Sequence, residues 1–388
     1  MNPHLSQRIA AVSDSPIPAI NKLIAANPGT IAMGQGVVGY APPPAIWDHV
    51  AAFQAEPRNH IYQDVDGIPQ LREALQAKLS QENRIDCRDS NVIVTSGSNM
   101  AFLHVILAIA DPGDEVIILS PHFFNHEMAL RFANVVPVSL PTDADYLPDI
   151  EALSQAMTPR TRAIVTVSPN NPTGAVYPEN TLQAVNALCA ARGVYHISDE
   201  AYEYFTYEDH QHYSPASAGG APGHTISLFS FSKAYGFASW RIGYMLVPRH
   251  LYGPLLRIQD TNPICPPVIS QFAALGLLES GVEFVRASMQ PLIDARAYCR
   301  QALQQQQAYL AMASPAGAFY FYIKLLTGGD SMQIVKALIE QYKIAVVPGA
   351  PFGDVSDCTF RVSYGAVSRE YLVEGVDRLI RGLQAYAA

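Results

Sequence analysis

Residues 225–236 read TISLFSFSKAYG, a short strand-like run followed at once by a lysine among small residues. The run Thr225–Ser230 predicts a buried strand, so Lys233 lies just beyond its carboxyl end. A lysine that is partly desolvated in such a position can be neutral and nucleophilic. Arg241, further along, offers a guanidinium fork that suits a phosphate. The alternative for this stretch is a surface lysine in a loop and an arginine in an ion pair.

Similar runs recur before and after this strand, separated by segments in which apolar residues have helical spacing. The predicted strands are Asn91–Thr95, Glu115–Ser120, Val135–Leu140, Ala163–Val167, Val194–Ser198, Thr225–Ser230 and Ile242–Val247. Several are apolar almost throughout, as expected when helices cover both faces of a sheet. Helices are expected between them, at Asn99–Ala110, His126–Phe132 and Asn180–Ala191. The alternation predicts an α/β fold with a mostly parallel, seven-stranded sheet.

The pattern changes after Thr261, where residues 262–267 read NPICPP. Two long helices are predicted next, over Val268–Leu278 and Val282–Tyr309. A compact strand and helix region completes the chain, at Ala318–Leu325, Met332–Tyr342, Ile344–Val347, Thr359–Ser363 and Glu370–Ala385. We therefore expect a large domain at residues 45–275 and a smaller α/β domain at residues 276–388. Residues 1–44 are expected to form an N-terminal arm and part of the small domain, including one of its strands.

The composition narrows the class of protein. The chain has 388 residues, 49% of them hydrophobic and 15% charged, which is enough for a large core. Its net charge is −9 and Lys and Arg do not cluster, which disfavours nucleic acid and anionic membranes as partners. Neither a targeting signal nor an apolar run of about 18 residues is found. Five scattered cysteines predict free thiols in the cytoplasm and no metal site, and no motif supports a nucleophilic cysteine.

Polar residues also follow the neighbouring predicted strands. Asp199 comes after Val194–Ser198 and suits pairing with a protonated heteroaromatic nitrogen, and Tyr202 can reach the same ligand. Asn171 lies in the rigid turn at residues 168–174, SPNNPTG, and offers an amide donor. The alternatives are an aspartate that caps a helix and an ordinary loop.

Two more strand ends complete the set. Ser98 and Asn99 open a predicted helix whose free amides form an anion site, or they are a simple helix cap. The glycine motifs that bind dinucleotides and nucleoside triphosphates are missing here. Phe123 follows Glu115–Ser120 and either stacks on a flat ligand or belongs to the core. Because ligands of open parallel sheets bind beyond the carboxyl ends of the strands, these residues are expected to share one site.

These motifs, in this order, resemble those of the fold-type-I enzymes that use pyridoxal 5′-phosphate (PLP), specifically the class I/II aminotransferase family. The matching segments are NPTG at residues 171–174, DEAY at 199–202, SxSK at 230–233 and RxGY at 241–244. Further matches lie at residues 62–72, at Gly34–Gly36 (GQG) and at residues 360–363 (FRVS). The resemblance covers residues 34–363, nearly the whole chain.

The resemblance implies a role for each of the catalytic residues. Lys233 would hold PLP as a Schiff base and move the proton that forms and resolves a quinonoid intermediate. Asp199 would keep the pyridine nitrogen protonated. Asn171 and Tyr202 would donate to the 3′-oxygen of the ring, and Phe123 would stack on its face.

The resemblance also implies the binding residues. The PLP phosphate would be held by Ser98, Asn99, Ser230, Ser232 and Arg241, together with Tyr62 from a second subunit. That arrangement implies a homodimer with shared active sites. The substrate would be bound by Gly36, Val37, Asn171 and Arg361, with Arg361 holding the α-carboxylate through two hydrogen bonds.

Departures from the family pattern concern the substrate. Asn99 stands where the branch for acidic substrates commonly carries Lys, so selectivity for a side-chain carboxylate is not expected. After Gly36 the family often has Pro-Asp-Phe, whereas residues 37–40 here read VVGY. In addition, Ser239 stands where the family frequently has Gly before Trp240. The Gly34–Gly36 segment is closer to the glutamine and aromatic, kynurenine-type aminotransferases.

The expected function is transfer of an amino group between an L-amino acid and a 2-oxo acid. The alternative is a PLP-dependent lyase or cyclase, which begins with the same residues and differs in the later steps. Residues 17–40 and 260–267, which line the substrate side of the site in relatives, would decide between amino transfer and the lyase or cyclase reaction. A PLP-fold binding protein without catalysis would lack Lys233 or Asp199, or carry a DNA-binding module, and this chain shows neither pattern. A nicotinamide dehydrogenase is disfavoured because the glycine fingerprint is missing.

Overall fold

The strand that precedes Lys233 lies inside the larger of the sheets in the computed structural model, which describes residues 6–313, 315–354 and 357–387. This sheet has seven strands in the order β2-β8-β7-β6-β5-β3-β4. Their bounds are β2 Ser90–Thr95, β3 Glu115–Ser120, β4 Val136–Pro141, β5 Thr161–Val167, β6 Tyr195–Asp199, β7 Thr225–Ser230 and β8 Gly243–Pro248. Each predicted strand is confirmed to within two residues. Only β8 runs antiparallel to its neighbours, so the sheet is mostly parallel, as predicted.

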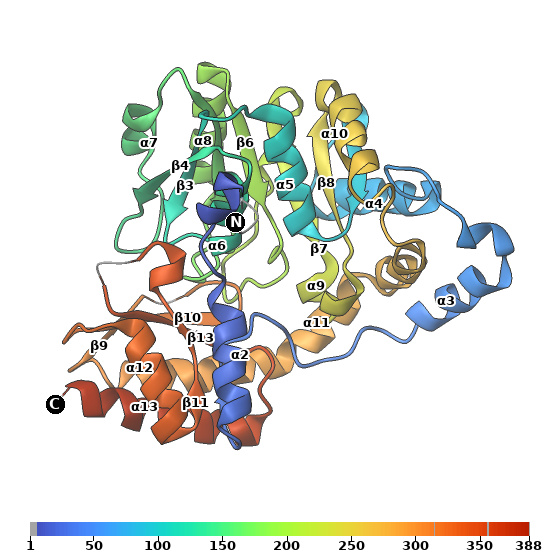
Figure 1. Ribbon diagram of the computed structural model, residues 1–388. Helices are drawn as coiled ribbons and strands as arrows, with labels where there is room; N and C mark the ends of the chain where they lie inside the picture. The colour runs from blue at the N-terminus through green and yellow to red at the C-terminus, as the bar shows by residue number, and fades with distance from the viewer. Residues whose placement is uncertain (1–5, 314, 355–356, 388) are drawn as a thin grey trace, which may run out of the picture.

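Helices cover both faces of this sheet because alternate strand residues point to opposite sides. Ala163 and Val165 of β5 pack with one group of helices, and Ile164 packs with the other. The first group contains α5 Ser98–Ile109, α6 Phe124–Phe132 and α10 Arg249–Thr261; the second contains α7 Ile150–Ala156 and α8 Glu179–Arg192. The apolar strands are thus buried from both sides, and their carboxyl ends are left as the open edge (Figure 1).

A second, smaller lobe lies beside the carboxyl edge of the large sheet (Figure 1). Its four-stranded antiparallel sheet has the order β12-β13-β10-β9. The bounds are β9 Leu310–Met312, β10 Tyr320–Leu325, β12 Val347–Pro348 and β13 Thr359–Ser363, with α12 Ser331–Ala337 and α13 Arg369–Ala387 packed nearby. The helix predicted at Met332–Tyr342 is correct only in its first half, because Leu338–Tyr342 forms a wider π-helical turn.

The long helix α11, Val268–Gln304, joins the lobes. The two helices predicted here form one element that is interrupted at Gly281, whose backbone is not helical. The prediction that the second helix reaches Tyr309 was wrong, because the chain turns after Gln304 to enter β9. Within the described residues, α11 is the one helix that is long and apolar enough to cross a membrane, judged by length and composition alone. Of its most apolar 18-residue stretch, 39% is buried in the protein. Its buried positions, such as Ala273 and Leu277, belong to the core.

The N-terminal part is more regular than its many prolines suggest. It forms α1 Gln7–Ala10, α2 Pro16–Ala26, β1 Ile31–Ala32, α3 Ile46–Ala55 and α4 Pro69–Glu82. Prolines stand in the first turns of α2 and α4, where a missing N–H costs nothing. The predicted strand of the arm is present, since β1 pairs in parallel with β11, Ile344–Ala345. The domain boundaries at residues 45 and 276 stay a prediction.

Candidate active site

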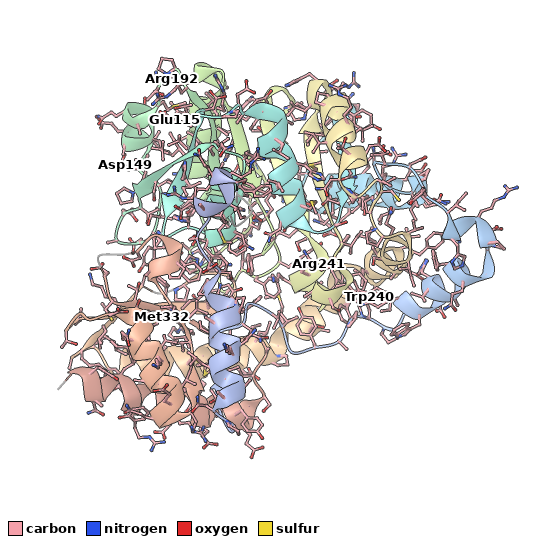
Figure 2. The ribbon with its side chains drawn as sticks, in the orientation of Figure 1. Glu115, Asp149, Arg192, Trp240, Arg241 and Met332 are labelled. Carbon is pink, nitrogen blue, oxygen red and sulfur yellow. The ribbon has the colours of Figure 1, made fainter. Side chains whose placement is uncertain are left out.

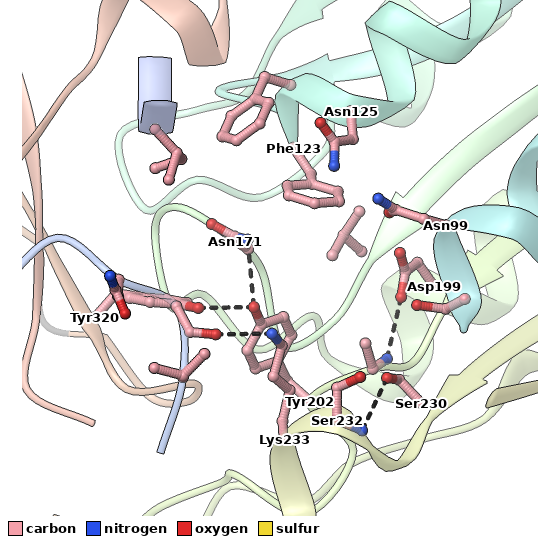
Figure 3. Close-up of a pocket in the computed structure, with 18 of the residues that line it drawn as sticks. Asn99, Phe123, Asn125, Asn171, Asp199, Tyr202, Ser230, Ser232, Lys233 and Tyr320 are labelled. Atoms are coloured by element: carbon pink, nitrogen blue, oxygen red, sulfur yellow. Dashed lines mark hydrogen bonds between the residues drawn. The ribbon is translucent and has the colours of Figure 1, made fainter. Parts of the chain in front are cut away.

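A cavity of about 440 Å³ lies at the carboxyl edge of the large sheet, where the smaller lobe faces it. Thirteen of the predicted site residues line it: Gly36, Val37, Ser98, Asn99, Phe123, Asn171, Asp199, Tyr202, Ser230, Ser232, Lys233, Arg241 and Arg361 (Figure 3). The remaining lining residues are Ile17, Gln35, Phe124, Asn125, Val167, Ala201 and Tyr320. Strand ends far apart in the sequence therefore meet in one place, as the parallel order requires.

Lys233 lies in the short helix α9, Phe231–Ala234, which follows β7 directly. Ser230 caps this helix, since its side-chain oxygen accepts a hydrogen bond from the backbone N–H of Ser232 at 3.1 Å. Lys233 Nζ donates to the carbonyl oxygen of Gly36 at 2.7 Å. Burial lowers the pKa of Lys233 to about 8, and the positive charges of Arg361 and Arg241 add to the effect. A neutral, nucleophilic amine is therefore accessible near neutral pH.

Asp199 ends β6 and is held by both of its carboxylate oxygens. Oδ2 lies 3.0 Å from Nε2 of His126, and Oδ1 accepts from the backbone N–H of Ala201 at 3.1 Å. His126 is itself buried and stacks on Phe102, with ring centroids 4.1 Å apart. The carboxylate is thus fixed and suited to bind an N–H of a heteroaromatic ring. The sequence analysis placed His126 only in a helix. Its position in the first turn of the helix that follows β3 was the available signal.

Asn171 and Tyr202 form a second group on the side toward the smaller lobe. Asn171 Nδ2 donates to the Tyr202 hydroxyl at 3.3 Å, and Asn171 Oδ1 accepts from Arg361 Nη1 at 2.7 Å. Arg361, in β13, is buried and also donates through Nη2 to the carbonyl of Gly34 at 2.8 Å. Its guanidinium carbon lies 4.5 Å from the centre of the Tyr320 ring. The two Nη nitrogens of Arg361 are thereby held at the cavity wall, beside the ring of Tyr320.

The opposite end of the cavity is built for an anion. Ser98 and Asn99 begin α5, so backbone N–H groups without helical partners point toward this end. Gly97 caps the helix with φ of 88°, and a Cβ there would lie 2.4 Å from Arg241 Nη2. Glycine therefore lets the guanidinium approach the helix terminus. Figure 2 shows Arg241 beneath α5, and the site of the anion would be shared with Ser230 and Ser232.

Tyr62 does not line the cavity of its own chain. It follows the turn Pro57–His60 and is 75% exposed. A residue that serves the site of a second subunit is expected to be exposed in a single chain. Its assignment to the phosphate stays a prediction.

Comparison with known proteins decides the family. Residues 28–379 match the family model described as aminotransferase class I and II. The chain belongs to this family. This aminotransferase is 32% identical to the aromatic aminotransferase ISS1 of Arabidopsis thaliana, over 96% of this chain and 94% of the relative. It is 34% identical to the aspartate/prephenate aminotransferase of Thermus thermophilus, over 98% of both chains.

Solved structures agree with this assignment. The aspartate aminotransferase of Thermus thermophilus with maleate has a TM-score of 0.90 at 32% identity, covering 98% of this chain and 100% of the other. The predictions of a fold-type-I architecture, a PLP-dependent enzyme and amino transfer between an amino acid and a 2-oxo acid are confirmed. The alternative of a lyase or cyclase gains no support from these relatives.

The residues of this aminotransferase fit PLP. Phe123, Val167 and Ala201 offer apolar surfaces for the faces of a flat ring. Lys233 is a buried amine for the aldehyde and Asp199 is a fixed acceptor for the ring nitrogen. The anion end suits the phosphate. The cavity volume also falls in the range usual for small-molecule sites.

Proposed function

We propose that this aminotransferase takes amino groups from amino acids with neutral, apolar or aromatic side chains, and that it acts as a homodimer. The observation that carries the first part is the charge of the cavity. Among the described residues that line it, the cations are Lys233, Arg241 and Arg361. In the roles implied above, Lys233 binds the aldehyde of the cofactor, Arg241 binds its phosphate and Arg361 binds the substrate α-carboxylate. No lining cation is then left for a side-chain carboxylate.

Apolar side chains line the part of the cavity reserved for the substrate. Ile17 comes from the N-terminal arm, Val37 follows the GQG segment, and Phe124 packs against Phe352 with ring centroids 5.4 Å apart. Transfer of an apolar side chain from water to such a wall is favourable, whereas a carboxylate there would lose hydration without a partner. The name of the Arabidopsis relative, an aromatic aminotransferase, supports the same class of substrate.

Each catalytic residue has a task that follows from its contacts. Bound PLP supplies an electron sink for negative charge at the substrate Cα. Asp199 would keep the proton on the ring nitrogen through the negative charge of its carboxylate. His126 fixes the position of that carboxylate. Lys233 Nζ would hold the cofactor before substrate arrives and would afterwards move the proton from the substrate Cα to C4′ of the cofactor. Arg361 fixes the α-carboxylate, which sets the orientation of the Cα–H bond.

The proposed substrate class predicts a clear ratio of rates. With a 2-oxo acid as acceptor, kcat/KM for phenylalanine should exceed that for aspartate by about tenfold or more. Ile17→Arg, which adds a cation to the apolar wall, should narrow this ratio, and Ile17→Leu should leave it unchanged. Coupled assays of both donors measure it. A wild-type enzyme that prefers aspartate would contradict the proposal and would require a cation from a partner subunit.

The homodimer is supported by apolar residues that are exposed in the segment 46–62. Trp47 on α3 is 60% exposed and Ile61 is 65% exposed, on the part of the chain that projects from the body (Figure 1). Trp47 contacts Trp240, which directly precedes Arg241 (Figure 2). Large apolar side chains exposed on one projecting segment suit an interaction surface. A second copy would cover them and bring its own Tyr62 toward Arg241.

Hybrid dimers test whether Tyr62 acts across the interface. One subunit carries Lys233→Ala and the other carries Tyr62→Ala. If Tyr62 serves the neighbouring site, each hybrid retains one intact site and regains about half of the wild-type activity per dimer, with wild-type affinity for PLP. If Tyr62 serves its own site, neither site is intact and wild-type affinity does not return. Purified hybrids, separated by two different tags, give the measurement.

We also propose that the protein resides in the cytoplasm. All five cysteines are free thiols, which supports a reducing compartment. Burial raises the pKa of Cys189 and of Cys299 to about 12, so these two are poor nucleophiles.

A further inference from the structure

Tyr320 connects the two lobes at the cavity wall. It belongs to β10 of the small sheet, and its hydroxyl lies 2.7 Å from that of Tyr202, which follows β6 of the large sheet (Figure 3). Tyr320 is fully buried and Tyr202 is 5% exposed. Burial raises the pKa of both phenols, so both keep their protons at physiological pH.

The surroundings restrict where the two phenol protons point. Tyr202 accepts from Asn171 Nδ2, and no second partner of the Tyr320 hydroxyl is found among the described residues. An anionic 3′-oxygen of the bound cofactor is the stronger acceptor, so Tyr202 donates into the cavity. Tyr320 then donates to Tyr202. In such a chain each hydrogen bond polarises the next and strengthens it.

The position of the Tyr320 hydroxyl is fixed from two further sides. The guanidinium of Arg361 lies over its ring, and Arg361 also binds Asn171, so four residues form a closed ring of contacts. On the other side, a Cβ at position 36 would lie 2.5 Å from the Tyr320 oxygen. Gly36 thus leaves room for this hydroxyl and presents its carbonyl to Lys233.

We infer that Tyr320 is a positioning residue, which acts through Tyr202 on the 3′-oxygen of the cofactor. Because Tyr320 also contacts Arg361, it connects this part of the site with the residue that binds the substrate carboxylate. The inference rests on the roles proposed above for Tyr202 and Arg361. Tyr320 holds the Tyr202 hydroxyl in the donating orientation and makes it a stronger donor. A stronger donor stabilises negative charge on the 3′-oxygen and lowers the pH at which the Lys233 nitrogen of the holoenzyme loses its proton.

The test is a pH titration of the absorption of the holoenzyme. Tyr320→Phe removes the hydroxyl and keeps the ring beneath Arg361. The midpoint of the titration should rise by about 0.5 to 1 pH unit, the size expected from one weakened hydrogen bond. Tyr322→Phe is the matched control, since this buried phenol lies two residues further along β10 and bonds to Thr359 Oγ1 at 2.8 Å. Its midpoint should equal that of the wild type.

A double variant separates action through Tyr202 from a general effect on packing. If Tyr320 acts through Tyr202, Tyr202→Phe raises the midpoint and adding Tyr320→Phe raises it no further. Additive shifts, or a Tyr320→Phe midpoint equal to the wild type, would overturn the inference and leave the proposed function intact. A Tyr202→Phe midpoint equal to the wild type would instead overturn the proposed role of Tyr202 and the inference with it. The same variants should change the kcat for phenylalanine more than its KM, because Arg361 keeps its contacts.

Discussion

Replacing Lys233 by alanine lowers kcat/KM for every amino donor by about 10⁴-fold or more, because one amine both holds the cofactor and moves the proton at Cα. Among the described residues that line the cavity, Lys233 supplies the one primary amine. Burial, which lowers its pKa to about 8, makes that amine nucleophilic. Steady-state assays with saturating PLP measure the loss.

Lys78→Met is the control for the loss of a buried lysine. Lys78 is buried, but it pairs with Glu203 and Asn83 outside the cavity. Its removal should lower the melting temperature and leave PLP bound with unchanged absorption. Substantial transfer by the Lys233→Ala enzyme would contradict the assigned role.

Arg361→Gln should lower kcat/KM by about 10²- to 10⁴-fold for amino acids and 2-oxo acids alike, since two charge-assisted hydrogen bonds to a carboxylate are lost. The content of bound PLP should change little, because Arg361 is assigned to the substrate. Kinetics with several donors, together with cofactor content, measure both quantities.

A second buried arginine provides the comparison. Arg296 also lies over a tyrosine ring, that of Tyr207 at 4.6 Å, and it donates to the carbonyl of Pro315 away from the cavity. Arg296→Gln should reduce stability while KM stays within about twofold, as expected for a change outside the site. An Arg361→Gln enzyme with normal KM would show that another group binds the carboxylate.

Much of the large lobe could be predicted because its strands are short, apolar and separated by helices with clear periodicity. The residues at or just beyond the ends of β5, β6 and β7 then had to share an edge, and Asn171, Asp199 and Lys233 do meet in one cavity. The reversed direction of β8 was not predicted, because a run of apolar residues carries no information on its direction. The wrong end of α11 has a similar cause, since residues 305–309 continue a helical composition that the turn into β9 overrides.

The site residues that the sequence analysis did not identify, Tyr320 and His126, reach the site through contacts between distant segments. Tyr320 and Tyr202 are separated by 118 positions and meet only because the small sheet packs against the edge of the large one. In the sequence, Tyr320 is one aromatic residue among the four at positions 319–322, FYFY, and nothing local marks it. His126 reaches Asp199 from α6, which likewise requires the sheet to be assembled first.

The most direct measurement of the central claim is to reduce the holoenzyme with borohydride, digest it and locate the cofactor by mass spectrometry. Lys233 should carry the cofactor mass, and the absorption band of the native enzyme should disappear on reduction. The other lysines available for attachment are Lys22, Lys78, Lys324, Lys336 and Lys343. A cofactor found on any of these, or none retained after reduction of an active enzyme, would contradict the assignment of Lys233.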